Sequence, residues 1–308
     1  MIKSVEIENL SRSFGRVEAL RDISLSVDKG ELFGFIGPDG AGKTTLFRIL
    51  VTLLLPGAGR ASVEGFDVVK DYKKIREVVG YMPGRFSLYQ DLSVEENLKF
   101  FAGSFKTTIK ENYHLIEGIY KHIEPFKKRL AGKLSGGMKQ KLALSCALVH
   151  KPEILFLDEP TTGVDAVSRK EFWEMLKRLQ EWGITIVVST PYMDEASLCD
   201  RVALIQNGSI MTIDSPENIS RSFRHQLLSV RADNMFSMTA DLEAMPGCRS
   251  AFRFGAEIHF TPEGSDTDIP ALEHYLKQQG HTGIMIRQIA PGIEDCFMDL
   301  MKKEENAR

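Results

Sequence analysis

Apolar and polar positions along residues 1–215 alternate between two patterns. Short apolar runs, several of them β-branched, predict strands at 5–8, 23–27, 32–36, 154–157, 184–189 and 202–206. Apolar residues spaced three or four apart predict helices after Lys43 and at 95–105, 112–123, 136–149 and 169–182. This alternation predicts an α/β sheet. Because the segment 92–149 has helical patterns and no clear strand, we expect a helical subdomain inserted in the α/β core.

The pattern changes near residues 214–223, where we expect a domain boundary. Just before it, the letters QNGS at 206–209 predict a two-residue turn between two hairpin strands. Beyond it, a strand, a helix, two strands, a helix, a strand and a last helix are predicted at 227–230, 235–244, 250–254, 257–261, 269–279, 284–289 and 293–302. The βαββαβ order is typical of ferredoxin-like domains. The predicted domains are therefore 1–218, which contains the helical subdomain, and an accessory domain over 222–308.

Composition limits the location and the partners of the chain. The formal net charge is -3, which gives no bias toward nucleic acid or an anionic membrane. The apolar runs have the length of strands, far below the roughly 18 residues that span a bilayer, and the N-terminus lacks the apolar core of a signal peptide. The four cysteines are scattered without CxxC spacing, so we expect buried thiols in a reducing compartment. These features predict a cytoplasmic protein.

The stretch GPDGAGKT at 37–44 fits the phosphate-loop pattern G-x-x-x-x-G-K-[ST]. It follows the apolar run LFGFI and precedes the helical pattern TTLFRIL, which is the context that this motif requires. Glycines let backbone N–H groups turn toward phosphates, and a helix N-terminus favours an anion. We expect Lys43 to reach the β- and γ-phosphates of ATP, Thr44 to bind Mg²⁺ and Thr45 to contact the α-phosphate. The other expected ATP-binding residues are Gly37, Pro38, Asp39, Gly40, Ala41 and Gly42.

Two further motifs follow. ILFLDEP at 154–160 predicts a buried strand that ends in two carboxylates. Asp158 would hold Mg²⁺ and Glu159 would polarise the attacking water, although the same letters also suit a helix N-cap. LSGGM at 134–138 predicts a helix capped by Ser135. Glycines in a first turn cost about 1 kcal/mol each relative to alanine, which indicates that something approaches the backbone closely; an anion and an ordinary helix start both fit.

Together, in this order and spacing, the three motifs resemble those of the nucleotide-binding subunits of ABC transporters, over about residues 1–215. The resemblance implies a P-loop NTPase core of ABC type, ATP hydrolysis and a head-to-tail dimer. It implies that Phe14 stacks on adenine, with ordinary packing as the alternative, and that Asp165 lies in a dimer-contact loop. Asp39 occupies a position where asparagine is more usual. ATP on one chain would be covered by the signature segment of its partner, which comprises Leu134, Ser135, Gly136, Gly137 and Met138.

The letters APGIEDCFMDLM at 290–301 and YMDEASLCDRVALIQNGSI at 192–210 resemble the ATP-binding subunits of ABC-2 type exporters. That class implies a separate membrane permease and a position on the cytoplasmic face of the membrane. The segment 80–102 corresponds to the family's contact with the permease, and we expect Phe86, Leu88 and Tyr89 to form an exposed apolar patch there. Two alternatives are a soluble ABC-type ATPase acting on ribosomes or DNA, and a regulatory subunit that binds ATP without turnover.

Two positions depart from the family pattern. Gly84 stands where the family has a glutamine that reaches Mg²⁺ and the attacking water, and Pro191 stands where it has a histidine that contacts the γ-phosphate. Removing one transition-state donor costs roughly 10²–10³ in rate. We therefore predict a degenerate site that binds ATP and hydrolyses it slowly. The same reasoning predicts a second, non-identical nucleotide-binding subunit as the partner. The net charge of -3 and the lack of a basic arm predict no nucleic-acid partner.

Overall fold

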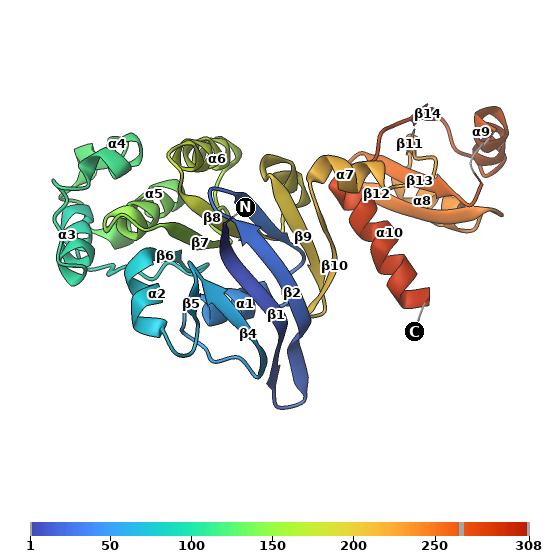
Figure 1. Cartoon of the computed structure of the whole chain (residues 1–308). Coiled ribbons are helices and arrows are strands. Elements are labelled where there is room, and N and C mark those ends of the chain that lie inside the picture. The colour runs from blue at the N-terminus through green and yellow to red at the C-terminus, as the bar shows by residue number, and fades with distance from the viewer. Residues whose placement is uncertain (1, 265–267, 307–308) are drawn as a thin grey trace. The chain divides into compact units, whose positions relative to one another are not determined.

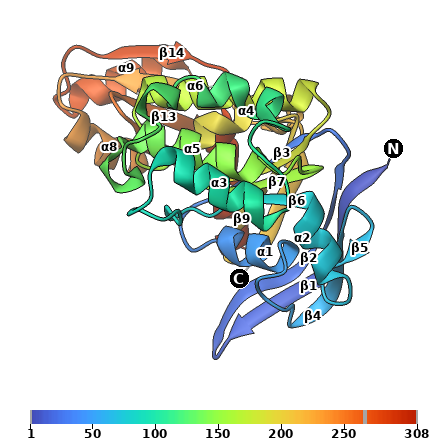
Figure 2. The same cartoon turned by 90° about the vertical axis from the view of Figure 1, so that its left-hand side faces the viewer.

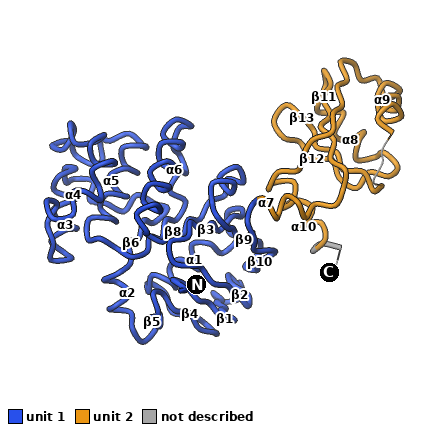
Figure 3. The backbone as a smooth tube through the Cα atoms, turned by 45° about the horizontal axis from the view of Figure 1, so that its top comes forward, with its two compact units in different colours: residues 1–216 blue, residues 217–308 orange. Residues whose placement is uncertain are grey.

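The computed structural model describes residues 2–264 and 268–306. The chain divides into two compact units, unit 1 over Met1–Pro216 and unit 2 over Glu217–Arg308 (Figures 1 and 3). Within the described residues, no helix has both the length and the apolar character needed to cross a bilayer. Each unit has its own apolar core, so each is described by itself.

The main sheet of unit 1 has six strands in the order β10-β9-β3-β8-β7-β6 (Figure 1). Their bounds are Leu32–Ile36 for β3, Val79–Met82 for β6, Ile154–Asp158 for β7, Thr185–Thr190 for β8, Arg201–Gln206 for β9 and Ser209–Asp214 for β10. β3, β6, β7, β8 and β9 run parallel, and β10 pairs antiparallel with β9. The predicted α/β core is confirmed. Because the strands are parallel, the carboxyl ends of β3, β7 and β8 meet at one edge of the sheet.

A second, antiparallel sheet has the order β2-β1-β4-β5. Its strands are β1 Lys3–Phe14, β2 Val17–Asp28, β4 Ala58–Val63 and β5 Phe66–Asp67. The apolar runs at 5–8 and 23–27 revealed only the buried parts of β1 and β2. The pattern did not reveal β4, because its sequence AGRASV buries only its last residues and carries a charged, exposed first half.

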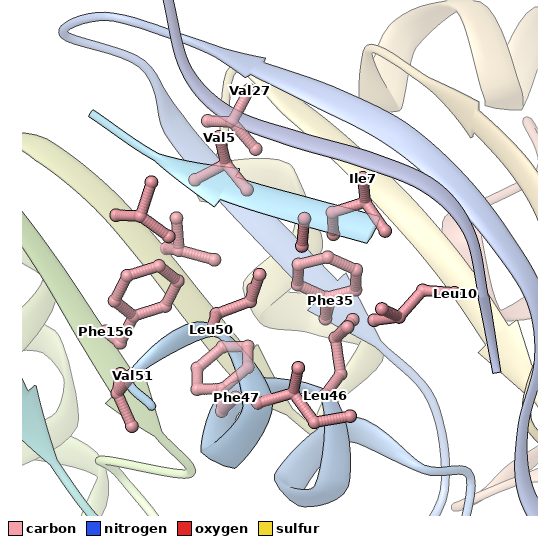
Figure 4. Packing of buried hydrophobic residues seen from close by; sticks show 14 of the residues in the cluster. Val5, Ile7, Leu10, Val27, Phe35, Leu46, Phe47, Leu50, Val51 and Phe156 are labelled. Atoms are coloured by element: carbon pink, nitrogen blue, oxygen red, sulfur yellow. The ribbon is translucent and has the colours of Figure 1, made fainter. Parts of the chain in front are cut away.

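Helix α1, Lys43–Leu50, lies in the core that the strands surround (Figure 4). The ring of Phe47 packs edge-on against Phe35 of β3 at 5.8 Å and Phe156 of β7 at 5.6 Å between ring centroids. Leu46 and Leu50 of the same helix are fully buried. Since such core side chains interdigitate at crystal-like density, these contacts fix the start of α1 relative to the ends of β3 and β7.

The remaining helices of unit 1 are α2 Tyr72–Val78, α3 Val94–Ser104, α4 Tyr113–Tyr120, α5 Gly136–Leu148 and α6 Ala166–Glu181, with 3-10 turns at Glu124–Phe126, Ala131–Lys133 and Met193–Leu198. α3 and α4 both pack against α5 (Figure 2). Between residues 92 and 149, all of them described, the named elements are helical. The structure thus has helices where the sequence pattern predicted an inserted helical subdomain.

Asn207 and Gly208 form the tight turn between β9 and β10, as QNGS predicted. Both have positive φ, 49° and 77°, which is the geometry of a two-residue hairpin turn that follows strand twist. Gly208 suits this conformation because it has no Cβ.

α7, Pro216–Arg221, starts at the last residue of unit 1 and otherwise belongs to unit 2, whose later elements follow the predicted βαββαβ order. Its elements are β11 Leu228–Arg231, α8 Met235–Glu243, β12 Cys248–Phe254, β13 Glu257–Pro262, α9 Ile269–Gln278, β14 Met285–Gln288 and α10 Ile293–Asn306. The antiparallel sheet has the order β12-β13-β11-β14. In this order the first and third strands of the unit lie in the centre, as in ferredoxin-like domains.

The four cysteines are free thiols. Cys146, Cys199 and Cys296 are buried as expected, whereas Cys248 is half-buried at the start of β12. Burial raises the pKa of each thiol. Since the thiolate is the reactive form of cysteine, these side chains act as small apolar groups in the fold.

Candidate functional site

The phosphate loop, residues 37–44, follows β3 and opens α1. Gly40 and Gly42 have φ of 80° and 106°, a region that strongly favours glycine. A Cβ on Gly37 would lie 2.1 Å from the carbonyl oxygen of Ile205, and one on Gly42 would lie 2.4 Å from that of Ala19. Neighbouring backbone therefore requires the first and last glycines of the motif.

The N-terminus of α1 is suited to an anion. Its N-cap is Gly42, which supplies no side-chain hydrogen bond, so the first N–H groups of the helix have no side-chain acceptor. Lys43 at the first position is only 3% exposed. Its Nζ donates to the carbonyl oxygens of Gly37 at 2.7 Å and Pro38 at 3.0 Å. Donors and positive charge therefore converge on the loop, as phosphate binding requires.

The two carboxylates at the end of β7 face this loop. Asp158 is 2% exposed, and its Oδ1 accepts hydrogen bonds from Thr44 Oγ1 at 3.1 Å and from Ser189 Oγ at 2.6 Å. Glu159 Oε1 lies 3.4 Å from Lys43 Nζ. A buried carboxylate beside a threonine hydroxyl offers the hard oxygen ligands that Mg²⁺ prefers. The residues present thus fit a magnesium-phosphate group.

Glu159 itself has an unusual backbone. Its φ is 50°, which is uncommon for a residue with a Cβ. The Glu159 N–H lies within hydrogen-bond distance of the carbonyl oxygen of Ser189 at 3.0 Å and of Ser189 Oγ at 3.1 Å. β8 thus holds the left-handed backbone of Glu159. This backbone directs the Glu159 side chain away from the line of β7 and toward Lys43. Asp158 and Glu159 do not form the helix N-cap that was the alternative, because Asp165 caps the following helix α6.

Phe14 ends β1 at the tip of the β1–β2 hairpin. Its ring is 48% exposed, and the guanidinium of Arg12 lies 5.0 Å from the ring centroid. Phe14 pairs with Val17 of β2, and Ala19, two residues further along β2, approaches Gly42 of the phosphate loop. An exposed aromatic face therefore stands a short way along β2 from the loop. Ordinary core packing does not account for it.

The phosphate-loop side chains differ in exposure. Asp39 is exposed, Ala41 is buried, and Pro38, Thr44 and Thr45 are half-buried. The departure from asparagine at Asp39 thus falls on a side chain in solvent, where water screens its charge.

The signature segment begins α5, and Ser135 caps it through a 3.4 Å hydrogen bond from the backbone N–H of Met138. The close approach that its glycines indicated comes from the chain itself. A Cβ on Gly137 would lie 2.8 Å from Ser168 Oγ, and one on Gly136 would lie 3.3 Å from the carbonyl oxygen of Gly163. An anion is therefore not needed to explain Gly137. In the same segment, Leu134 is buried, and Ser135 and Gly136 are exposed.

Asp165, expected in a dimer-contact loop, caps α6. Its Oδ1 accepts from the backbone N–H of Ser168 at 3.0 Å. Hydrogen bonds from Ser168 lower the pKa of Asp165. Since Ser168 also touches Gly137, this cap places the loop 161–166 directly against the start of α5.

The two departing positions adjoin different parts of the candidate site. A Cβ on Gly84 would lie 3.0 Å from the carbonyl oxygen of Asp158 and 3.7 Å from the Cβ of Glu159. Pro191 follows Thr190, whose carbonyl oxygen accepts from the Gly37 N–H at 3.3 Å. Gly84 thus adjoins the acidic pair and Pro191 adjoins the phosphate loop, and neither supplies a side-chain donor.

Sequence reasoning missed Ser189 and Tyr81. Ser189 bonds to Asp158 and to the backbone of Glu159. The polar residues at the end of the strand beside β7 could have indicated this role. Burial and the nearby charge of Asp158 raise the pKa of Tyr81 to about 12. Tyr81 lies on β6 next to Phe156 of β7, but β6 was itself not predicted, so nothing marked this side chain.

A groove of about 360 Å³ lies elsewhere on unit 1, between the end of β6 and the helical subdomain. Phe105 of this groove stacks on His150 with ring centroids 3.8 Å apart. Leu88 is buried in it, so the prediction that Leu88 is exposed was wrong; Tyr89 is exposed and packs on Phe100 at 4.8 Å, and Phe86 is half-buried. The lining is mostly apolar and comprises Val51, Leu53, Arg76, Val79, Tyr81, Met82, Pro83, Ser87, Leu88, Phe101, Phe105, Ala143, Cys146, Ala147 and His150.

The chain is similar in sequence to known proteins. A family model described as "ABC transporter" matches residues 20–162. Nod factor export ATP-binding protein I of Burkholderia lata is 36% identical, with 98% of each chain covered. NatA, an ABC transporter ATP-binding protein of Bacillus subtilis, is 36% identical over 69% of this chain and 88% of its own. A probable multidrug ABC transporter ATP-binding protein of Escherichia coli, YbhF, is 39% identical over 70% of this chain, and that match spans 38% of YbhF.

Solved structures share the fold of unit 1. The chain is similar to cbiO1 of Clostridium perfringens, described as part of the ABC transporter complex cbiONQ, with a TM-score of 0.64 and 28% identity over 72% of this chain and 92% of that one. The cassette MJ0796, solved as a dimer bound to ADP and Pi, gives a TM-score of 0.62 at 24% identity over 68% of this chain and 98% of that one. At that identity the second likeness concerns the fold alone.

Proposed function

Because this chain belongs to the family of ABC transporter ATP-binding proteins, we propose that it binds ATP with Mg²⁺ and couples ATP hydrolysis to export through a separate membrane permease. One observation carries the proposal. The Lys43 ammonium of the phosphate loop lies 3.4 Å from Glu159 Oε1, and Thr44 bonds to Asp158. Phosphate-binding, metal-binding and water-activating groups therefore meet at one point.

The residues divide the work. The loop 37–44 and the start of α1 bind the phosphates, and Lys43 neutralises charge on the β- and γ-phosphates. Thr44 and Asp158 would hold Mg²⁺, which would offset the negative charge of the phosphates. Phe14 offers a face for the adenine ring. Glu159 would orient and polarise the attacking water, and its 3.4 Å distance from the Lys43 ammonium supports this role.

A second nucleotide-binding subunit completes the site. The signature residues lie at the start of α5, in the helical part of unit 1. They are not part of the phosphate loop of the same chain. In a head-to-tail dimer, Ser135 and the α5 N-terminus of one chain would cover ATP on the other. The capped loop at Asp165 lies against that segment and would carry contacts between the subunits.

The site of this chain is degenerate, and its partner is a non-identical subunit. Gly84 adjoins the carboxylates and Pro191 adjoins the phosphate loop, and neither offers a side-chain donor. The rate effects of losing two groups that act together in one site are not additive. Glu159, the proposed catalytic carboxylate, is in place. The chain therefore holds ATP and turns it over slowly, while its intact signature completes a faster site on the partner.

The groove beside β6 would receive an ABC-2 type permease. It is apolar, and Arg76 is the one residue in its described lining that carries a fixed charge. This composition suits an apolar helix end of a membrane protein. The named relatives include Nod factor export and multidrug proteins, which supports export and a position on the cytoplasmic face of the membrane.

A second candidate is a regulatory subunit that binds ATP without turnover. Gly84 and Pro191 favour it, since both donors expected at the γ-phosphate are absent from the sequence. The two candidates differ in one measurement. An exporter subunit with a slow site loses its residual turnover in Glu159→Gln and keeps ATP binding, whereas a regulatory subunit has the same negligible turnover in both forms.

The experiment uses the full chain, alone and with its permease. ATP binding is measured by calorimetry with and without Mg²⁺, and turnover by phosphate release. We expect micromolar-range ATP binding and turnover well below 1 per second for the isolated chain, since enzymes of this kind commonly run at about 1–10³ per second. Turnover of several per second by the chain alone would contradict the degenerate site. Failure to bind ATP would contradict the function.

A further inference from the structure

The turn of the β9–β10 hairpin lies directly on the phosphate loop. The backbone N–H of Gly208 donates to the carbonyl oxygen of Ala41 at 3.0 Å, and the carbonyl oxygen of Gly208 accepts from the N–H of Arg21 at 2.8 Å. One residue thus joins the phosphate loop to β2 through both of its backbone polar groups. No side chain takes part in this link.

Position 208 accepts only glycine without movement. Its φ of 77° favours glycine. A Cβ there would also lie 2.8 Å from the carbonyl oxygen and 3.0 Å from the carbonyl carbon of Ala19. Both atoms belong to the backbone of β2, which cannot rotate aside as a side chain can. Any larger residue therefore pushes the turn and β2 apart.

β2 is also the strand that positions the aromatic face. Phe14 pairs with Val17, and Ala19 is the residue that approaches both Gly42 and Gly208. The segment from Val17 to Arg21 therefore runs from the base-stacking side chain to the phosphate loop. The link between Gly208 and this segment therefore sets the distance between Phe14 and the phosphate loop.

We propose that Gly208 is a positioning residue for the nucleotide, which holds β2 and the phosphate loop at the spacing that lets ATP contact Phe14 and the loop at the same time. The proposal rests on the proposed ATP binding. ATP spans both elements, whereas inorganic tripolyphosphate contacts the loop alone. A residue with a Cβ at position 208 thus weakens ATP binding more than tripolyphosphate binding.

The test compares Gly208→Ala with Gly30→Ala in the full chain. Gly30 has nearly the same φ, 76°, and a Cβ there has no neighbour within 4 Å. It precedes β3, at the opposite end of that strand from the phosphate loop. The control therefore carries the same backbone strain without the clash on β2. Calorimetry gives the Kd of each variant for Mg-ATP and for Mg-tripolyphosphate.

We expect Gly208→Ala to raise the Kd for ATP about tenfold, which is less than the roughly 10²-fold that a full 1 Å misplacement can cost, and to leave that for tripolyphosphate within about twofold. Gly30→Ala should change neither. In a Phe14→Ala background, Gly208→Ala should add little, because the base contact is already lost. Should Gly208→Ala not fold, Gly208→Asn keeps the left-handed backbone accessible and is measured in the same way.

Each other outcome overturns the inference. Equal losses for ATP and tripolyphosphate would mean that the loop itself is distorted, and unchanged ATP binding would mean that the spacing does not matter. An effect as large in Gly30→Ala would reduce the result to backbone strain. If the unsubstituted chain binds no ATP, the proposed function fails first, and that result is read before any variant.

Discussion

Ser189 Oγ lies 2.6 Å from Oδ1 of Asp158, deep within the edge of the sheet where β7 and β8 end side by side. The same hydroxyl is 3.1 Å from the backbone N–H of Glu159. One side chain therefore contacts the proposed metal ligand and the backbone that aims the proposed catalytic carboxylate. Because Asp158 and Thr44 are also bonded, Ser189 holds one end of a short polar chain that reaches the phosphate loop.

Ser189→Ala is expected to weaken Mg²⁺-dependent ATP binding about tenfold. A hydrogen bond to a charged group contributes about 1.5–3 kcal/mol, part of which Asp158 retains through Thr44. Calorimetry as a function of Mg²⁺ concentration measures the loss. Ser197→Ala is a matched control, because Ser197 is exposed and its hydroxyl donates only to a nearby carbonyl oxygen, that of Asp194. Equal Mg²⁺ dependence in the two variants would contradict this role for Ser189.

Lys43→Met should reduce nucleotide affinity at least 10²-fold. It removes the ammonium that bonds to Gly37 and Pro38 and faces Glu159, and charge-assisted hydrogen bonds to phosphate are about twice as strong as neutral ones. Fluorescence titration with a labelled ATP analogue measures the change. Lys74→Met is the control, since Lys74 is exposed and pairs only with Asp71 and the ring of Phe66. ATP binding by Lys43→Met close to that of the unsubstituted chain would contradict the loop's proposed role.

Four of the five parallel strands, β3, β7, β8 and β9, were predictable because they are apolar on both faces. Leu32–Ile36 is an uninterrupted apolar run, and β3 has those bounds. β6 was not predictable, because VGYM is only four residues long. Its Gly80 is required by packing, since a Cβ there would lie 2.5 Å from the carbonyl oxygen of Ala147. That constraint comes from α5, which is distant in the sequence. Tyr81 was missed for the same reason, since its place beside Asp158 depends on β6 pairing with β7.

The residues of the candidate site likewise divide into those that the sequence indicated and those that it did not. Lys43, Thr44, Asp158 and Glu159 stand in local motifs, so their residue types and spacing are enough to indicate phosphate and metal chemistry. Gly137 shows the limit of such reasoning. Its close neighbour is Ser168 Oγ, a contact between two helices that the local pattern, interpreted as an anion site or a plain helix start, did not contain.

Phe14→Ala should weaken ATP binding by roughly 1–3 kcal/mol, which is the usual contribution of one stacked base. Tripolyphosphate binding should not change, because the ring is 48% exposed and lies outside the loop. Calorimetry with the two ligands separates the effects. Phe236→Ala, at an 84% exposed ring in unit 2, serves as the control. A parallel loss for both ligands would show that Phe14 supports the fold rather than the base.

The double variant Gly84→Gln with Pro191→His should raise ATP turnover at least tenfold. Each substitution returns a donor that would be worth roughly 10²–10³ on its own, and the two act on one site. The added Cβ at position 84 meets Asp158 backbone at 3.0 Å, so some of the gain is offset by a small shift of that strand end. Phosphate release is measured beside an intact partner subunit. Gly84→Ala with Pro191→Ala is the control, and equal rates in the two double variants would show that the missing donors do not limit hydrolysis.

Unit 2 should lose stability on acidification through Asp299. Burial alone would raise the pKa of Asp299, but its ion pairs with Lys303 of α10 and Arg249 of β12 outweigh burial and lower it below its usual 3.8. A carboxyl with a lowered pKa in the folded state stabilises the fold above its unfolded pKa. That contribution is lost as the pH falls through the folded value, so the loss falls below about pH 4.

Asp299→Asn tests this directly, because it removes the charge and leaves the shape. We expect a loss of about 2 kcal/mol near neutral pH, the size of a hydrogen bond to a charged group. The difference from the unsubstituted chain should shrink below about pH 4, where both carry a neutral group. Chemical unfolding of the full chain between pH 3 and 7, followed through the NMR signals of β12 and β13 in unit 2, measures both effects. Glu217→Gln is the control, since Glu217 is exposed and pairs with the exposed Arg221 on the same helix α7. A difference between Asp299→Asn and the unsubstituted chain that does not depend on pH would show that packing of α10, and not the charge of Asp299, holds the helix to the sheet.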